Sequence, residues 1–218
     1  MSARRPAPSS NGHASAVRHL RRVDRRLREV IDAVGPCTLR PRRERFAMLA
    51  RSIVAQQISV AAAKTINARV VELVAPQRLS AEALLAVSPA RLRAAGVSQQ
   101  KAAYLADLAA RVAGGEVRLT GLARRDDETI IADLTKIKGI GRWTAQMFLI
   151  FALGRPDVLA EDDLGLRGAV QRIHALPAMP SKAEFRGLAA PWSPFSTVAS
   201  WYCWRSADLK LIGGPRRG

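Results

Sequence analysis

Apolar residues recur along most of the chain at the spacing of one helical face. From Val17 to Val34 they stand three or four positions apart, and arginines fill the positions between them. We therefore predict one helix over residues 17–34, ended by Gly35 and Pro36. Further helices are predicted over residues 46–54 and 60–74. No stretch alternates with the period of two that a half-buried strand needs, so the pattern predicts an all-α fold of about ten short helices.

Small polar residues mark where several of these helices begin and end. Ser88-Pro89 and Ser98 are residue types that favour a helix N-cap, and Ser181 with Glu184 has the spacing of a capping box. Gly114 and Gly115 stand where a helix is expected to stop. These helix-capping and helix-stop residues therefore support a fold of short helices joined by tight connections.

Composition divides the chain into a short tail and one folded region. Residues 1–16 are small, polar and proline-bearing, and we predict that they form a disordered basic tail. The remaining residues, 17–218, have the length of one domain or of two closely packed lobes. Hydrophobic residues make up 48% of the chain, which is typical of a globular protein.

The balance of charge is strongly basic. The chain has 35 Lys and Arg against 18 Asp and Glu, a net charge of +17, and residues 1–45 alone hold 12 Arg and 4 acidic residues. Such a charge attracts polyanions, of which DNA and RNA are the leading candidates. A charge that only keeps the protein dissolved is the simpler alternative.

Other sequence signals exclude several classes of protein. The two cysteines, Cys37 and Cys203, are too few for a disulfide scaffold and have no metal-binding spacing with the three His. Charged residues interrupt every long apolar stretch, and the N-terminus lacks the apolar core of a signal peptide. We therefore predict a cytoplasmic protein.

The helical pattern is broken most clearly at residues 134–144. Gly139-Ile140-Gly141 lets the backbone turn tightly, directly before the predicted helix that starts with Arg142. The free N–H groups and positive dipole end of a helix N-terminus suit a phosphate, and Lys136 and Lys138 add charge with no acid between them. An ordinary turn between two helices would explain the same glycines without any ligand.

Glu161, Asp162 and Asp163 form an acidic triple in this basic chain. Carboxylates near DNA phosphates are repelled, so their presence carries an electrostatic cost. One of them can simply be the N-cap of the next helix. The functional interpretation is a carboxylate that stabilises positive charge developing on a sugar, as in glycoside hydrolysis.

Several motifs together resemble one family. LTKIKGIGRWTA is similar to the helix-hairpin-helix of the DNA glycosylase superfamily known as HhH-GPD, and GRPDVLAEDDLGLR is similar to the loop and acidic residue that follow it there. RSIVAQQISVAAAKTINARV resembles the upstream helix pair, and PWSPFSTVASWYCW resembles the last helix of AlkA-type 3-methyladenine glycosylases. The resemblance covers roughly residues 40–205 and lacks the N-terminal β-rich domain of the bacterial AlkA type. It implies a two-lobed, all-α glycosylase fold with the active-site cleft between the lobes.

The resemblance also implies roles for individual residues. It makes Asp163 the catalytic carboxylate, with Asp162 as the alternative, and Gln57 or Gln56 the wedge that fills the gap left by a flipped base. The pocket for that base would be lined by Trp143, Met147, Leu164 and Trp201. DNA would be bound through Lys136, Lys138, Gly139, Gly141, Arg142 and Thr144. A monovalent cation, Na⁺ or K⁺, would sit on the backbone carbonyls of Thr135, Ile137 and Gly139.

These roles compete with structural alternatives. Most of the aromatic residues crowded into residues 192–204 could simply pack a core, with Trp201 as the exception, and Gln56 and Gln57 could form a solvent-facing turn. Met147 and Leu164 replace tyrosines of the AlkA type, which makes the pocket less polar.

The position of Trp143 predicts the type of reaction. Relatives that also cut the DNA strand have at this position a lysine that forms a Schiff base, so the resemblance implies a monofunctional enzyme that leaves an abasic site. The expected substrate is double-stranded DNA carrying alkylated purines, bound by a monomer without an iron–sulfur cluster or another cofactor. The alternatives are a non-catalytic helix-hairpin-helix DNA-binding protein, a bifunctional or mismatch-specific glycosylase, and an RNA-binding protein that binds by charge alone.

Overall fold

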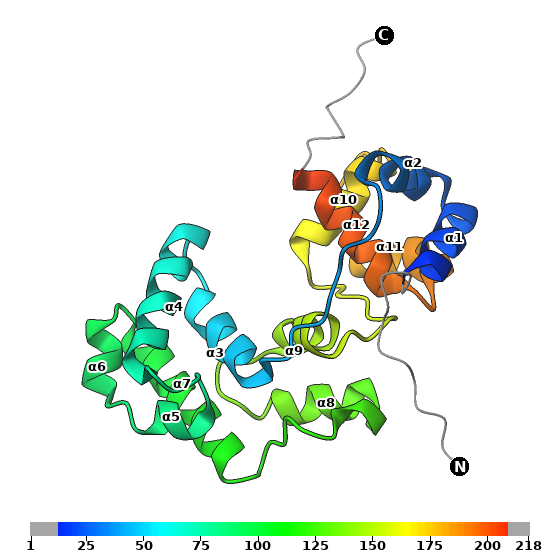
Figure 1. Cartoon of the computed structure of the whole chain (residues 1–218). Helices are drawn as coiled ribbons and strands as arrows, with labels where there is room; N and C mark the ends of the chain where they lie inside the picture. The colour runs from blue at the N-terminus through cyan, green and yellow to red at the C-terminus, as the bar shows by residue number, and fades with distance from the viewer. Residues whose placement is uncertain (1–12, 209–218) are drawn as a thin grey trace. The chain divides into compact units, whose positions relative to one another are not determined.

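The computed structural model describes residues 13–208, and these residues form helices and loops without any strand. The predicted all-α class is therefore confirmed. The chain divides into two compact units (Figure 1). Among the described residues, unit 1 combines residues 13–40 with residues 155–208, and unit 2 is the continuous segment Pro41–Gly154.

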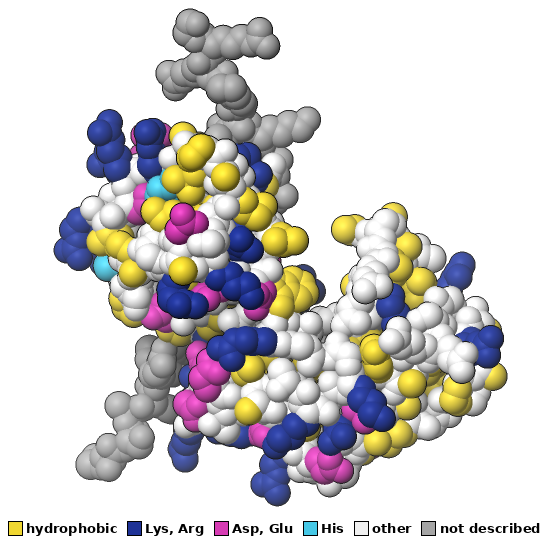
Figure 2. Space-filling model, turned by 180° about the vertical axis from the view of Figure 1, so that it is seen from behind, with side chains coloured by type: hydrophobic (Ala, Val, Ile, Leu, Met, Phe, Trp, Pro, Cys, Tyr) yellow, Lys and Arg dark blue, Asp and Glu magenta, His cyan; other side chains and the backbone are white. Residues whose placement is uncertain are grey.

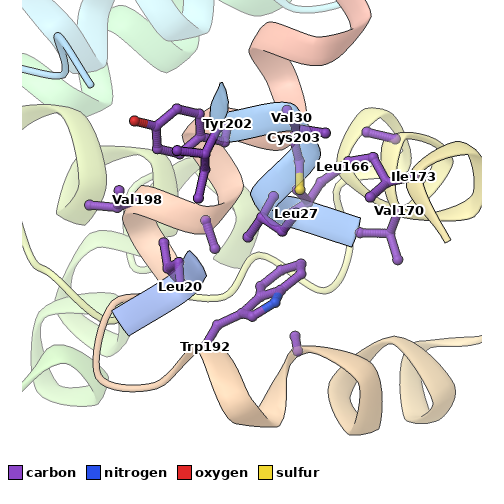
Figure 3. Close-up of a cluster of buried hydrophobic side chains, with 14 of the residues drawn as sticks. Leu20, Leu27, Val30, Leu166, Val170, Ile173, Trp192, Val198, Tyr202 and Cys203 are labelled. Atoms are coloured by element: carbon purple, nitrogen blue, oxygen red, sulfur yellow. The ribbon is translucent and has the colours of Figure 1, made fainter. Parts of the chain in front are cut away.

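Unit 1 joins the two ends of the described chain. Its elements are α1 (Ala14–Val23), α2 (Arg25–Val34), α10 (Leu164–Ile173), α11 (Lys182–Ala189), the 3₁₀ turn η3 (Ala190–Trp192) and α12 (Ser196–Asp208). Helix α2 packs against α12, although about 170 residues separate them (Figure 1). Figure 3 shows the core between them, in which Leu20, Leu27, Leu166, Trp192 and Tyr202 are fully buried or nearly so.

A buried carboxylate organises the first two helices of unit 1. Asp24 has extended backbone angles and accepts a hydrogen bond from the Leu27 amide at 2.9 Å, so it caps α2. Its second oxygen accepts a 2.8 Å hydrogen bond from the Trp192 indole N–H. The prediction of one helix over residues 17–34 is therefore wrong: the apolar spacing continues through Asp24, but the cap divides the segment into two helices. The predicted end at Gly35 is confirmed.

Unit 2 contains the remaining elements. They are α3 (Arg45–Ala55), α4 (Val60–Val74), α5 (Ala81–Leu85), α6 (Pro89–Ala94), α7 (Gln99–Ala113), the 3₁₀ turn η1 (Leu122–Arg124), α8 (Asp127–Leu134), α9 (Arg142–Phe148) and the π-helical turn η2 (Leu149–Leu153). Helix α3 lies at the centre, in contact with α4, α7 and α9. Buried Leu49, Ile53, Leu105 and Phe148 form part of this core.

Several predicted helix ends are confirmed. Ser88 and Ser98 cap α6 and α7, Gly114 ends α7, and Ser181 with Glu184 forms a complete capping box. Helix α1 begins at Ala14, before the predicted boundary at residue 17, because Ala16 is buried in the core of unit 1. The rest of the predicted tail, residues 1–12, lies outside the described residues. No helix within residues 13–208 is both long and apolar enough to cross a membrane.

Candidate nucleic-acid interface and active site

The glycine turn at the centre of the predicted hairpin joins α8 to α9. Gly139 has a φ of 81°, in the left-handed region, and a Cβ built on it would overlap the ring of Tyr104 on α7. Only glycine meets both demands, since every other residue has a Cβ and adopts this φ at a cost. The tight turn predicted for residues 134–144 is therefore present, between Leu134 and Arg142.

This turn presents unused backbone donors. Among the described residues, the N–H groups of Gly139 and Gly141 donate to no other protein group. Gly141 is the N-cap of α9 and offers no side chain to its first turn. Thr144 lies in that turn, where backbone N–H groups have no partner inside the helix, and the residue is buried. Clustered amide donors of this kind suit an anion.

The basic side chains of the hairpin have acidic neighbours that the sequence pattern did not indicate. Lys136 pairs with Asp133 at 2.7 Å, and Arg142 pairs with Glu128 through contacts of 2.5 and 2.8 Å. The Arg142 guanidinium lowers the pKa of the Glu128 carboxyl. Figure 2 shows Lys and Arg side chains scattered over the visible face, several of them beside Asp or Glu. No acid interrupts the basic residues in the sequence, but α8 brings carboxylates to two of them in the fold.

Lys138 differs from the other two basic residues. Its backbone N–H donates to the Asp107 carboxylate of α7 at 2.9 Å, while its side chain is exposed. Within residues 13–208, no carboxylate lies within ion-pair distance of its ammonium group. Of the three basic side chains of the hairpin, that of Lys138 is therefore the least neutralised by a nearby carboxylate.

Two of the three carbonyls predicted to hold a monovalent cation already accept hydrogen bonds. The Gly139 carbonyl accepts from the Gln56 amide at 2.7 Å, and that of Ile137 accepts from the Ile140 N–H at 3.0 Å. Each carbonyl oxygen keeps a second lone pair, and oxygen ligands suit a hard cation. The donor set therefore fits such an ion. The described residues contain no group of three His, Cys, Asp or Glu that could hold a metal.

The two adjacent glutamines follow α3 and do not lie within it. Helix α3 ends at Ala55, close to the predicted end at residue 54, and both glutamines lie in the turn that follows it. Gln56 is half-buried and donates to Gly139, whereas Gln57 is exposed and has a φ of 55°. The left-handed backbone at Gln57 turns the chain sharply between α3 and α4. Of the two, Gln57 has the side chain that is available to a partner.

The three acidic residues of the triple have different surroundings in unit 1. Glu161 receives two hydrogen bonds from Arg186, at 2.7 and 2.6 Å, and Asp162 forms an ion pair with Lys182. Asp163 is the N-cap of α10 and accepts from the Leu166 amide at 2.7 Å. The alternative that one acid of the triple caps the following helix is therefore confirmed, for Asp163. A cap and a catalytic role are compatible, because a carboxylate has two oxygens and several lone pairs.

The predicted pocket residues are divided between the units. Trp143 and Met147 lie on α9 in unit 2, Trp143 with 44% of its surface exposed and Met147 buried. Leu164 and Trp201 belong to unit 1, and Leu164 is 65% exposed at the first position of α10. The exposed Trp143 and Leu164 side chains are accessible to a ligand, although other large hydrophobic side chains, such as that of Val60, are exposed as well.

Trp201 is half-buried on α12. Its ring meets Tyr202 edge to face at 4.9 Å between centroids, and the Arg205 guanidinium lies 6.0 Å from the ring. Although Trp201 is excepted from the core-packing alternative, it packs partly against the core of unit 1. Trp192 and Tyr202 are core residues.

Helix α7 supplies contacts that sequence reasoning missed. Tyr104 packs on Gly139, Asp107 accepts the Lys138 N–H, and Lys101 donates to carbonyls beside Gln57. These residues stand three apart, on one face of the helix. That spacing was the available signal, but a polar helical face usually indicates only exposure to solvent.

Comparison with known proteins extends over both units. The model of the HhH-GPD superfamily of base excision DNA repair proteins matches residues 50–194. DNA-3-methyladenine glycosylase 1 of Schizosaccharomyces pombe is 32% identical over 204 residues, which cover 91% of this chain and 90% of the relative.

Two solved structures are similar over nearly the same range. The DNA-3-methyladenine glycosidase of Bacillus halodurans has a TM-score of 0.81 and 36% identity, and the match covers 90% of both chains. The 3-methyladenine DNA glycosylase of Schizosaccharomyces pombe, in complex with abasic DNA, has a TM-score of 0.80 and 31% identity. That match covers 92% of this chain and 100% of the other. The likeness therefore involves the whole fold, beyond the hairpin alone.

Proposed function

Because this chain belongs to the HhH-GPD superfamily of base excision DNA repair proteins, we propose that it is a DNA glycosylase that excises alkylated purines from duplex DNA. The substrates would be of the 3-methyladenine and 7-methylguanine type, and the product an abasic site. The observation that carries the proposal is the match of nearly the full chain to enzymes named for 3-methyladenine.

The DNA backbone would be bound at the glycine turn. The unused N–H groups of Gly139 and Gly141 are suited to one phosphate, and the exposed Lys138 ammonium adds charge. On DNA binding, the Arg142 guanidinium would break its ion pair with Glu128 and pair with a phosphate instead. Breaking this ion pair costs little free energy, because both partners are about half exposed or more. Such surface pairs contribute only about 0–1 kcal/mol to stability.

The hairpin could also use a cation. A monovalent ion on the carbonyls of Thr135, Ile137 and Gly139 would add positive charge beside the same phosphate.

The chemistry would take place at the sugar of the flipped nucleotide. When the bond between the base nitrogen and C1′ breaks, its electron pair leaves with the base and positive charge develops on the sugar. The Asp163 carboxylate would stabilise that charge. Water then adds to C1′ and loses a proton, which leaves an abasic site and a free base. An N-alkylated purine carries positive charge and departs neutral, so the reaction needs no strong acid.

Selection of the base would depend on an aromatic and apolar pocket. Trp143 and Trp201 would stack on the flipped base, and Met147 and Leu164 would line the remaining surface. An indole face attracts a cationic base more than a neutral one, which favours alkylated purines over normal bases. Gln57, exposed and on a sharp turn, would occupy the gap in the duplex.

Strand cleavage is not expected. Position 143 holds an indole, which cannot form a Schiff base with the sugar. We also propose that the protein acts as a monomer in the cytoplasm, associated with the nucleoid when it is bound to DNA.

The direct test is incubation with duplexes that carry 3-methyladenine, 7-methylguanine, hypoxanthine or uracil, followed by alkali to reveal abasic sites. We expect cleavage at the two alkylated purines after alkali and none before it. A protein that binds these duplexes but releases no base from any of them would instead be a non-catalytic helix-hairpin-helix DNA-binding protein.

A further inference from the structure

Lys101 has an unusual position for a lysine. It lies in the first turns of α7, half-buried, and its ammonium group donates to the Val54 carbonyl at 2.8 Å and to the Gln56 carbonyl at 2.6 Å. Removal from water lowers the pKa of this group. The ammonium therefore gives up part of its hydration to reach these two oxygens.

The two carbonyls stand at the end of α3, where the chain turns toward α4. The last carbonyls of a helix have no partner inside it, and they carry the negative end of the helix dipole. A cation at this point satisfies two of them and interacts favourably with the dipole. The next residue is Gln57, whose left-handed backbone conformation is unfavourable for a residue that has a Cβ.

A second contact joins the same turn to the hairpin. The Gln56 side chain donates to the Gly139 carbonyl at 2.7 Å, while its own backbone carbonyl accepts from Lys101. On the other side of the hairpin, Tyr104 and Asp107 hold Gly139 and Lys138 from the same helix as Lys101. Helix α7 thus holds both the Gln57 turn and the glycine turn, all within unit 2.

We propose that Lys101 is a positioning residue that holds the Gln57 turn at a fixed distance from the phosphate-binding glycine turn. It does not touch the DNA. The inference rests on the proposed glycosylase function, because the Gln57 turn matters only when a base leaves the duplex. Its consequence is that a phosphate bound at Gly139 sets the position at which Gln57 enters the gap.

The test compares Lys101→Met with Arg118→Met. Methionine keeps most of the length of lysine but has neither charge nor donor, and Arg118 is an exposed residue of unit 2 whose replacement changes the net charge equally. Single-turnover excision is measured on two duplexes. In one the alkylated purine is paired, and in the other it is unpaired in a bulge, where flipping costs little.

We expect Lys101→Met to slow excision of the paired lesion about tenfold or more, as for the removal of charge-assisted hydrogen bonds, and that of the bulged lesion much less. Arg118→Met should slow both equally, if at all. In a double-mutant cycle, Lys101→Met should add little to Gln57→Ala on the paired lesion, because both act through one turn. Wild-type rates on the paired lesion, equal losses on both duplexes, or additive losses in the cycle would each overturn the inference.

If the proposed glycosylase function itself is wrong, a different result is expected. The wild-type protein then excises no base from either duplex. The inference is then decided by hydrogen exchange of the amides in residues 55–60, which Lys101→Met should accelerate and Arg118→Met should not. Unchanged exchange in this segment would overturn the role of Lys101 without reference to activity.

Discussion

The Asp163 carboxylate accepts a hydrogen bond from the backbone N–H of Leu166 at 2.7 Å, and this contact makes it the N-cap of α10. The residue proposed for the chemistry is therefore also part of the scaffold. Substitutions at this position must separate the two roles. Asparagine keeps the cap oxygen and removes the charge, whereas alanine removes both.

Asp163→Asn is expected to abolish most of the chemistry and to leave the fold intact. Single-turnover excision should fall roughly a hundredfold or more, as for other losses of preorganised charge stabilisation. Binding of lesion DNA should be unchanged or tighter, because a negative charge close to phosphates is removed. Rates with enzyme in excess and binding titrations measure the two effects separately.

The matched control is Asp162→Asn. Asp162 pairs with Lys182 on the surface of unit 1, so most of the activity should remain. Asp163→Ala should in addition lose about 1 kcal/mol of stability through the missing cap. Wild-type excision by both asparagine variants would leave the acidic triple with only a structural role.

The ion pair between Arg142 and Glu128 leads to a prediction about affinity. Glu128→Gln should strengthen DNA binding, because Arg142 no longer has to exchange a carboxylate for a phosphate. Lys138→Ala together with Arg142→Ala should weaken binding to lesion and plain duplexes equally. The slope of log affinity against log salt should shrink by about 0.9 for each phosphate that the variant no longer neutralises. An unchanged slope in the double variant would remove the hairpin from the interface.

Borohydride trapping tests the type of reaction. No lesion-dependent covalent protein–DNA adduct is expected, because position 143 is tryptophan and no amine stands there to form a Schiff base. Gel electrophoresis after reduction detects such an adduct directly. A strong adduct in the wild-type protein would contradict the monofunctional assignment, and a Trp143→Lys variant provides a matched comparison.

Trp201→Ala should separate recognition of the base from recognition of the DNA backbone. Loss of stacking is expected to cost about 1–3 kcal/mol in excision of cationic bases, but less in binding of an abasic-site analogue, which has no base to stack. Part of the ring packs on the core, so Trp201→Phe, which keeps an aromatic face, is the control. Equal losses on both ligands would mean that Trp201 is only structural.

The buried Asp24 carboxylate leads to a prediction about how the stability of the fold depends on pH. Burial raises its pKa, but the nearby His174 ring and the hydrogen bonds accepted from the Leu27 N–H and the Trp192 indole N–H outweigh burial and hold the pKa below its usual value. Ionised Asp24 therefore contributes stability above the pKa of the unfolded carboxyl, about 3.9, and the contribution is lost as the pH falls through the folded pKa. Urea unfolding should show wild type more stable than Asp24→Asn at about pH 6, with a difference that shrinks below about pH 4.

The control for this prediction is Asp32→Asn. Asp32 is exposed and pairs with Arg21 on the surface, so its substitution should change stability little at any pH. A difference between wild type and Asp24→Asn that stayed constant down to about pH 2 would contradict the role assigned to the Asp24 charge.

The helical fold was predictable because local signals agree with one another. Val60–Val74 is a helix with the predicted bounds, and Ser88, Ser98 and Ser181 cap helices as their residue types indicate. The division at Asp24 was missed because its cause is tertiary. Its carboxylate binds an indole 168 residues away, and no local pattern contains that partner.

The candidate site was predictable where it depends on backbone geometry. Gly139 has the left-handed conformation that its place in the turn requires. The acidic partners were less predictable, because Glu128 stands 14 residues from Arg142, and Asp107, which accepts from the Lys138 backbone N–H, stands 31 residues from Lys138. The position of Gln56 was also less predictable, since its side-chain contact with Gly139 spans 83 residues.

The order of assembly follows from the way unit 1 is divided along the chain. Unit 2 is continuous, so all its contacts can form as soon as Gly154 has left the ribosome. Helices α1 and α2 must wait for α10 and α12, across a gap of more than a hundred residues, and closing so large a loop costs entropy and time. During synthesis the phosphate-binding turn would therefore be complete while the helix that Asp163 caps still lacked its core. A nascent chain could bind DNA before it could cut a base.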